Sequence, residues 1–388
     1  MKEDKAFLAF AALMFFSLLS ERILFVVFPV YLLSLHFNAE QIGLVFSIAG
    51  ALLLITRPFI GRLSDTVGRK VVMSFGLVTQ AVAVSAYAFA NTFLAFSIVK
   101  SVEQISDTLN ASVDNALLGD TYKKGVRAKV ISKLGIWYTY ARLITIIIGF
   151  ITSTYLALSS NFFVAALAAL LSLFVVNFML SEKNKTSASV EKRPPLLKSM
   201  LGYSTNFKKM LVVGFLSESA YNFVYVPAFF VLAVNIGMQA STIFLYLFVS
   251  YVINSTIFYF LGKRKVNLGT KTVCMLGFVV YGLALASYAL ASQQLQILVI
   301  IPFVTLGFYL YRIGNQRILL DMTKTKTRGE QVGIYQTLVS LSDVVIPAVA
   351  GYMITAVSIT SVFITGGACA MGAALAIYLI RDGGGARR

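Results

Sequence analysis

The sequence contains little charge, only two cysteines and a single histidine. Charged residues make up 13% of the 388-residue chain, about half the fraction typical of soluble domains, so lipid is predicted to surround most of it. Cys274, Cys369 and His36 cannot build a disulfide framework or a thiolate and imidazole metal site. No GxxxxGKS or GxxxxGKT motif for a nucleotide phosphate occurs either. We therefore expect no metal, no cofactor and no enzyme chemistry.

Apolar residues, by contrast, are abundant: they make up 58% of the chain, and its mean hydropathy is +0.81. A helix needs about 20 apolar residues to span a bilayer. The first apolar segment is too long for a cleavable signal, whose apolar core is about 7–15 residues, so it is expected to remain as a membrane helix. We predict an all-α polytopic membrane protein with helices near residues 6–35, 40–62, 71–90, 93–119, 129–155, 160–181, 207–235, 240–261, 272–291, 294–319, 330–356 and 358–380.

The net charge of +17 is distributed unevenly. Basic residues lie mostly in alternate connections, such as 123–133, 183–209 and 263–271, whereas 36–40, 91–92, 156–161, 235–241, 292–294 and 356–358 contain neither Lys nor Arg. This positive-inside pattern predicts that both termini are cytoplasmic. It indicates a lipid bilayer, not a nucleic acid, as the partner. The polar segment 181–199 predicts a flexible cytoplasmic linker, which gives domains at 1–181, 182–205 and 206–388.

The sequence also repeats itself. The stretch GRLSDTVGRK at 61–70 returns as GKRKVNLGTK at 262–271, an offset of 201 (262 − 61). The same offset relates Gly61/Gly262, Gly68/Gly269, Lys70/Lys271, Gly76/Gly277, Tyr87/Tyr288, Asp120/Asp321 and Arg127/Arg328. An even number of spans in each copy gives both halves the same orientation. Such parallel repeats predict a binding site between the halves, near the bilayer midplane.

GRLSDTVGRK fills every position of the pattern G-x-L-x-D-x-x-G-R followed by Arg or Lys, and it resembles the signature after the second helix of the major facilitator superfamily. The twelve spans, the central linker and the degenerate second copy agree with this superfamily, and the chain resembles its drug and metabolite efflux branch. The resemblance implies a secondary transporter that works by alternating access. It also implies a cytoplasmic gate, for which the candidates are Gly61, Asp65, Gly68, Arg69, Lys70, Asp120, Arg127, Asp321 and Arg328.

Within this motif, residues 61–70 are expected to form a tight turn whose glycines permit close backbone approach. The family's gating acid corresponds to Asp65, and a helix starting near Glu330 is its candidate partner, because a carboxylate gains about 0.3–1 kcal/mol near a helix N-terminus. A topology anchor is the simpler alternative. In the second copy Val266 replaces the acid, so gating is expected to remain only in the first half.

Eleven charged residues fall within the predicted spans away from their ends, and each costs at least about 2.5–3.5 kcal/mol at the bilayer centre. The third, sixth, eighth, ninth and twelfth spans contain none of them, and in this family the third helix of each triplet faces lipid. In the fourth span Lys100, Glu103, Asp107 and Asp114 share one face, and Lys100 can pair with Glu103 locally. The resulting candidates for the proton and substrate cavity are Glu21, Arg22, Glu103, Asp107, Asp114, Arg142, Glu218, Tyr221, Tyr225, Tyr309, Arg312 and Asp343.

Burial favours the protonated form of a carboxyl group, so we hypothesise that Glu21 or Glu218 carries a coupling proton, with Asp107 and Asp343 as further candidates. Structural ion pairs are the alternative. Aromatic residues surround Glu218 in SESAYNFVYVPAFF, which suits an organic cation, although ordinary helix packing explains them equally well.

The leading function is proton-coupled efflux of lipophilic or cationic small molecules. Two departures weaken it: the fifth span lacks the Gly-Pro signature of many drug antiporters, and Lys100 and Gln104 replace the Arg and Gly of the family's fourth-helix pattern. The alternatives are an organic-anion transporter that uses Arg22, Arg142 and Arg312 as a carboxylate clamp, a lipid or lysolipid flippase, and a transport-inactive sensor. We expect a monomer in a prokaryotic plasma (inner) membrane.

Overall fold

The computed structural model describes residues 2–121, 124–180, 203–263, 269–323 and 328–380. The chain divides into two compact units. Unit 1 comprises Met1–Phe37, Leu44–Val190 and Met238–Phe248, and unit 2 comprises Asn38–Gly43, Glu191–Gly237 and Val249–Arg388. The predicted linker lies mostly outside the described residues.

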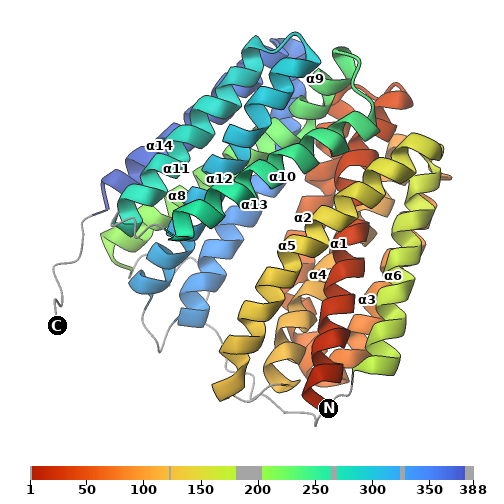
Figure 1. The fold of residues 1–388 in the computed structure, drawn as a ribbon. Coiled ribbons are helices and arrows are strands. Elements are labelled where there is room, and N and C mark those ends of the chain that lie inside the picture. Colours follow the sequence, from red (N-terminus) through yellow and green to blue (C-terminus); the bar gives the residue numbers. More distant parts are fainter. Residues whose placement is uncertain (1, 122–123, 181–202, 264–268, 324–327, 381–388) are drawn as a thin grey trace. The chain divides into compact units, whose positions relative to one another are not determined.

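The described residues are all-helical, with twelve long helices as predicted (Figure 1). In the first half these are α1 (Lys2–Ser34), α2 (Ala39–Val67), α3 (Arg69–Ala86), α4 (Phe93–Thr121), α5 (Lys124–Tyr155) and α6 (Ser160–Met179). The second half has α8 (Thr205–Phe223), a π-helical turn η1 (Val224–Ala228), α9 (Phe229–Asn235), α10 (Ala240–Lys263), α11 (Thr270–Ser287), a 3-10 turn η2 (Tyr288–Leu290), α12 (Gln294–Met322), α13 (Arg328–Ala356) and α14 (Ile359–Tyr378). The segment α8–η1–α9 counts as one long helix.

The turn predicted over residues 61–70 is shorter in the structure. Helix α2 continues to Val67 and α3 begins at Arg69, which leaves Gly68 as the only residue between them. Gly68 has φ 109° and ψ 139°, a conformation open to glycine but not to residues with a Cβ atom. The chain therefore reverses at one glycine, and the preceding charged residues stay helical. The side chains of Gly61 to Thr66 lie outside the described part.

A second difference concerns the seventh predicted helix, which is interrupted. Val226 has non-helical angles (φ −143°, ψ 92°) just before Pro227. Proline removes a backbone donor and clashes with the preceding turn, and single π-helical turns often occur at functional sites. Pro29 in α1 and Pro347 in α13, by contrast, lie within unbroken helices. The interruption follows directly after the predicted site residues of α8.

The two units repeat the same packing scheme. In unit 1, α3 packs against α4 and α6, while α1 packs against α5 and α6. In unit 2, α11 packs against α12 and α14, while α8 packs against α13 and α14. These pairings correspond one to one under the sequence repeat, so each pair of helices has a counterpart in the other unit.

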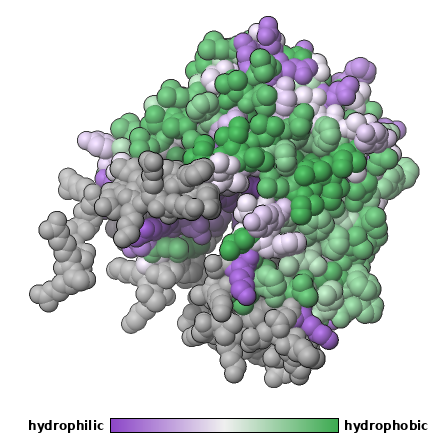
Figure 2. Space-filling model, viewed as in Figure 1, coloured by the Kyte–Doolittle hydropathy of each residue, from purple (hydrophilic) through white to green (hydrophobic). Residues whose placement is uncertain are grey.

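The described helices have the length and composition of a membrane protein. Ten of them are long and apolar enough to cross a bilayer; the other two are α3 and α4, and α4 contains the charged residues Lys100, Glu103 and Asp107. Hydrophobic side chains cover most of the described surface visible in Figure 2. Along α3, four exposed apolar residues follow the helical period: Val71, Phe75, Val78 and Val82. Such a stripe is suited to lipid.

Candidate functional site: charged and aromatic clusters in the two units

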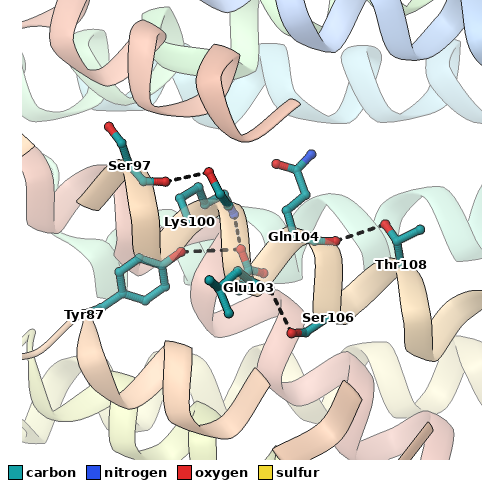
Figure 3. Close-up of polar contacts among 9 residues, drawn as sticks. Tyr87, Ser97, Lys100, Glu103, Gln104, Ser106 and Thr108 are labelled. Carbon is teal, nitrogen blue, oxygen red and sulfur yellow. Dashed lines mark hydrogen bonds and ion pairs between the residues drawn. The ribbon is translucent and has the colours of Figure 1, made fainter. Parts of the chain in front are cut away.

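The fourth-helix charges form a buried cluster in unit 1. The Lys100 ammonium lies 2.5 Å from Glu103 Oε2, and the side chains are only 14% and 9% exposed. Tyr87, at the end of α3, donates a long hydrogen bond of 3.4 Å to the same oxygen. Figure 3 shows Tyr87 and Lys100 converging on this carboxylate from two helices. The local pair predicted from the sequence therefore forms, and Tyr87 is an addition that the cavity candidates did not include.

Aromatic rings enclose the cation of this pair. The Lys100 ammonium lies 5.3 Å from the ring centre of Phe28 on α1 and 5.2 Å from that of Phe46 on α2. Phe28 also packs against Tyr87, with ring centres 4.5 Å apart. A desolvated cation gains about 2 kcal/mol from such faces. Lys100 is thus held by one carboxylate and two rings, which indicates a fixed structural role.

The remaining acids of unit 1 differ in their partners. Glu21 pairs with its neighbour Arg22 at 2.9 Å, and the side chain of Glu21 is 55% exposed. Asp107 has an exposed side chain, and its charged neighbours are Glu103, Glu21 and Lys100. It forms no ion pair or hydrogen bond with the described part of the chain. Asp107 is therefore the acid of this cluster that is available to a ligand.

Two further candidates of unit 1 have different outcomes. The Arg142 guanidinium on α5 lies 5.5 Å from the ring centre of Tyr138, one turn earlier on the same helix, and it has other contacts as well. Asp114 belongs to the last part of α4, and its side chain lies outside the described part. The structure thus brings Glu103 and Asp107 together on one face of α4, whereas the predicted position of the Asp114 side chain on that face is not tested.

In unit 2, a polar cluster joins α8 to α13. Asn222 Nδ2 donates a hydrogen bond of 2.8 Å to Asp343 Oδ1 and one of 3.3 Å to Ser342 Oγ. The hydroxyls of Ser219 and Ser342 lie 3.2 Å apart. These contacts link residues about 120 positions apart in the chain, so no local spacing in the sequence could have indicated them.

Glu218 lies one turn before Asn222 on the same helix face. The side chain is half-buried, and its charged neighbours are Asp343 and Arg312. Like Asp107, it makes no ion pair or hydrogen bond with the described residues. Each unit therefore contains, in a long helix, one acid whose carboxylate is not taken up by another side chain of the described residues.

Aromatic residues stack along the helix that carries Glu218. The rings of Tyr221 and Tyr225 lie 5.2 Å apart at 29°, and Tyr225 continues to Phe229 at 5.4 Å. On α12, the Arg312 guanidinium lies 5.3 Å from the ring centre of Phe308, which also contacts Tyr221 at 6.4 Å and Tyr309 at 5.8 Å. The predicted aromatic residues of unit 2 therefore form one connected set of rings on the helices that carry Glu218 and Arg312.

A neighbouring contact was not predicted. Asn315 Nδ2 on α12 donates 2.8 Å to the Tyr335 hydroxyl on α13. The Tyr335 ring packs against Gly214 of α8, where a Cβ atom would lie within 2.5 Å of it. One tyrosine of α13 thus contacts both α8 and α12. Its signal in the sequence is only a single aromatic residue.

The gate candidates are described only in part. Gly68 forms the turn between α2 and α3, Arg69 begins α3, and the Lys70 ammonium binds carbonyl oxygens at the end of α6. Asp321 is exposed in the last turn of α12. The side chains of Gly61, Asp65, Asp120, Arg127 and Arg328 lie outside the described residues, so the gate stays a prediction.

The family follows from the sequence comparison. A model described as Major Facilitator Superfamily matches residues 10–313. The chain belongs to the Major Facilitator Superfamily. Members of this superfamily are transporters, not enzymes. The protein is thus a multi-pass membrane transporter of a small molecule, which agrees with the predicted recognition and fold class.

Two curated relatives of this facilitator are distant. It is 21% identical over 340 residues to an uncharacterized MFS-type transporter of Methanocaldococcus jannaschii, covering 86% of this chain and 85% of that protein. It is 25% identical over 263 residues to a bicyclomycin resistance protein homolog of Haemophilus influenzae, covering 66% and 63% respectively.

Solved structures show the same fold. A variant of the nucleoside transporter NupG aligns with a TM-score of 0.79 at 14% identity, covering 97% of this chain and all of that one (100%). The human organic anion transporter MFSD10 aligns with a TM-score of 0.64 at 15% identity, covering 97% of this chain and 99% of that one. A bacterial homolog of the human lysosomal transporter Spinster aligns with a TM-score of 0.69 at 13% identity, covering 97% of this chain and 95% of that one. At these identities the likeness concerns the fold alone.

Proposed function

We propose that this facilitator exports lipophilic or cationic small molecules in exchange for protons. The observation that carries the proposal is the pair of available acids, Asp107 on α4 and Glu218 on α8. A charged group inside a bilayer is costly unless it is neutralised. Either a proton or a cationic substrate can neutralise a carboxylate, and competition between the two is what coupled exchange requires.

Of the other predicted acids, three already have partners, and the side chain of Asp114 lies outside the described residues. Glu21 pairs with Arg22, Glu103 pairs with Lys100, and Asp343 accepts a hydrogen bond from Asn222. The sequence alone favoured Glu21 and Glu218 as coupling groups. The contacts support Glu218 but move the emphasis in the first half from Glu21 to Asp107.

The surroundings of Glu218 support an aromatic or lipophilic cation. The stacked rings of Tyr221 and Tyr225 lie on the same helix, one turn and two turns after the acid. Aromatic faces beside a carboxylate are the usual way in which proteins bind organic cations. The similarity to a relative named as a bicyclomycin resistance protein homolog supports efflux of a foreign compound, although bicyclomycin itself is not thereby implied.

The test uses purified protein in liposomes loaded with a pH-sensitive dye. Addition of tetraphenylphosphonium or ethidium should move protons in the direction opposite to the cation, relative to protein-free liposomes. Asp107→Asn and Glu218→Gln should each lower the coupled proton flux by at least about tenfold, equivalent to ~1.4 kcal/mol. Glu40→Gln, in the first turn of α2, is the matched control and should leave the flux unchanged.

Full proton flux in the Asp107→Asn/Glu218→Gln double variant would show that coupling resides elsewhere. If only Glu21→Gln abolished flux, Glu21 would replace Asp107 as the acid of the first half.

A second candidate function is organic-anion transport. Arg312 has an exposed side chain above Phe308 and forms no ion pair within the described part of the chain. A guanidinium binds carboxylates in a two-pronged manner. In the same liposomes, proton movement together with benzoate, lost in Arg312→Gln but retained in Glu218→Gln, would favour this function over cation efflux.

A further inference from the structure

The repeated motif contains a lysine that, in both copies, donates to backbone oxygen at the end of the last helix of its half. Lys70, the last residue of GRLSDTVGRK, donates to Asn177 O at 2.8 Å and to Leu180 O at 3.0 Å. Lys271, 201 residues later, donates to Ile380 O at 2.6 Å. The first set of acceptors lies at the end of α6 and the second lies just after the end of α14.

The acceptors on Asn177 and Leu180 belong to the last turn and C-cap of α6, whereas Ile380 directly follows the C-cap of α14. The last four carbonyl groups of a helix have no donor within the helix, and they carry the negative end of the helix dipole. A lysine ammonium satisfies both conditions. Leu180 and Ile380 are 5% and 4% exposed, so little other surface of these residues is open to solvent.

Additional contacts strengthen the junction in each unit. In unit 1, Ser74 Oγ, one turn after Lys70, donates 3.2 Å to Asn177 Oδ1. In unit 2, Lys271 lies 6.0 Å from the ring centre of Tyr378, and Lys209 of α8 donates 2.5 Å to Leu379 O. The end of α14 is thus bound by two lysines, and the end of α6 by one among the described residues.

We propose that Lys70 and Lys271 are positioning residues that clamp the third helix of each half to the end of its sixth helix. This assigns to the motif a second task, separate from the gating expected of its acid. The acid is absent from the second copy, where Val266 replaces it, whereas the lysine is present in both. The clamp therefore explains why the lysine recurs in a copy that has lost the gating group.

Hydrogen–deuterium exchange of the intact protein in lipid nanodiscs tests the clamp without any substrate. Lys70→Met should speed exchange of the last-turn amides of α6 (residues 176–180) by about twofold to fivefold, and should leave the end of α14 unchanged. Lys271→Met should act on residues 376–380 instead. The increase in exchange should be smaller than for Lys70→Met, because Lys209 still binds the end of α14. The Lys209→Met/Lys271→Met double variant should show an increase as large as that of Lys70→Met.

Conservative and remote substitutions complete the design. Lys70→Arg and Lys271→Arg keep the donor and should return exchange to within about 1.5-fold of the wild-type rate. Lys133→Met on α5, an exposed lysine, should affect neither helix end. Unchanged exchange at the end of α6 in Lys70→Met would overturn the proposal. An equal increase at both helix ends in either single variant would also overturn it, because that result indicates general loosening of the fold.

Discussion

Helices α3 and α4 of the first half and helices α11 and α12 of the second occupy equivalent places in the repeat, so their contacts can be compared position by position. Gln80 and Asn110 are joined by a hydrogen bond of 2.8 Å. At the positions 201 residues later (281 − 80 and 311 − 110) stand Tyr281 and Tyr311, whose rings lie 5.2 Å apart. One pair of helices is joined by amides, and the other by aromatic rings.

The charged residues of α4 show the same difference: aromatic or apolar residues stand at the equivalent positions of α12. Asp107 corresponds to Phe308 (308 − 107 = 201), and the pair Lys100 and Glu103 corresponds to Ile301 and Val304. The tyrosine at the end of each third helix, Tyr87 or Tyr288, is present in both.

The comparison indicates that backbone packing and site chemistry vary independently in this protein. Both helix pairs are close-packed over a glycine, Gly76 or Gly277. On this shared backbone packing, α4 carries charged side chains, whereas α12 carries aromatic ones. Proton handling in this pair of helices is therefore expected of α4, and contacts with lipophilic substrate are expected of α12.

The largest effect should come from breaking the buried ion pair. Lys100→Met leaves the Glu103 carboxylate, 9% exposed, without its cation, which costs about 3–5 kcal/mol of folding free energy. Lys100→Ile combined with Glu103→Val copies the second half, and should recover most of that loss because a well-packed apolar pair replaces a buried ion pair at little cost. The loss of stability in both variants is measured as the half-life for thermal inactivation in detergent.

Lys133→Met is the control for loss of one positive charge. A double variant as unstable as Lys100→Met would mean that the first half cannot accept the chemistry of the second. The two helix pairs would then differ in backbone packing as well as in side chains.

An intermediate effect should come from the glycines. An added Cβ at Gly277 would meet the backbone of Leu310 and Tyr311, whereas at Gly76 it would meet mainly the side-chain amide of Asn110. Backbone cannot move without shifting α12, so Gly277→Ala should cost about 1–3 kcal/mol. Gly76→Ala should cost about 1 kcal/mol, because Asn110 can turn away at the expense of its bond to Gln80.

Melting temperatures in the same detergent compare the two glycine variants. Gly135→Ala, where an added Cβ meets no atom within 4 Å of the described chain, is the control. A Gly76→Ala variant that is less stable than Gly277→Ala would contradict the assignment of the rigid contact to the second half.

Much of the fold could be predicted because its signals are local. Apolar length defines the spans, and the offset of 201 defines the two halves, whereas the orientation inferred from charge in alternate connections stays a prediction. The Lys100 and Glu103 pair was also predictable, since the two residues lie one turn apart on one helix. Gly68 was correctly placed in a turn, but the sequence did not show that α2 stays helical up to Val67.

The parts that could not be predicted depend on contacts between helices. Asn222 reaches Asp343 across 121 positions, and nothing in either segment identifies the other. Lys70 was interpreted as an anchor on the inner face, whereas its acceptors lie more than 100 residues away. The interruption of the seventh helix falls at Pro227 but not at Pro29 or Pro347, and nothing in the sequence around these prolines distinguishes them.

The smallest expected effect concerns two buried tyrosine hydroxyls. Both rings are fully buried (0% exposed). Tyr87 donates to Glu103 over a long 3.4 Å, whereas the Tyr281 hydroxyl has no hydrogen-bond partner among the described residues. Tyr87→Phe should therefore cost about 1 kcal/mol or less, and Tyr281→Phe should be neutral or slightly stabilising, because it removes a buried polar atom that is unsatisfied. Melting temperatures measure both.

The combination with the ion-pair swap makes this difference decisive. In the Lys100→Ile/Glu103→Val background the Tyr87 hydroxyl has lost its acceptor, so it should behave like that of Tyr281. Tyr87→Phe should then change from slightly destabilising to neutral or stabilising, since leaving a buried donor without a partner costs about 1–3 kcal/mol. A cost that stays the same in both backgrounds would show that Tyr87 acts through packing of its ring, and that its contact with Glu103 contributes nothing to the difference between the two helix pairs.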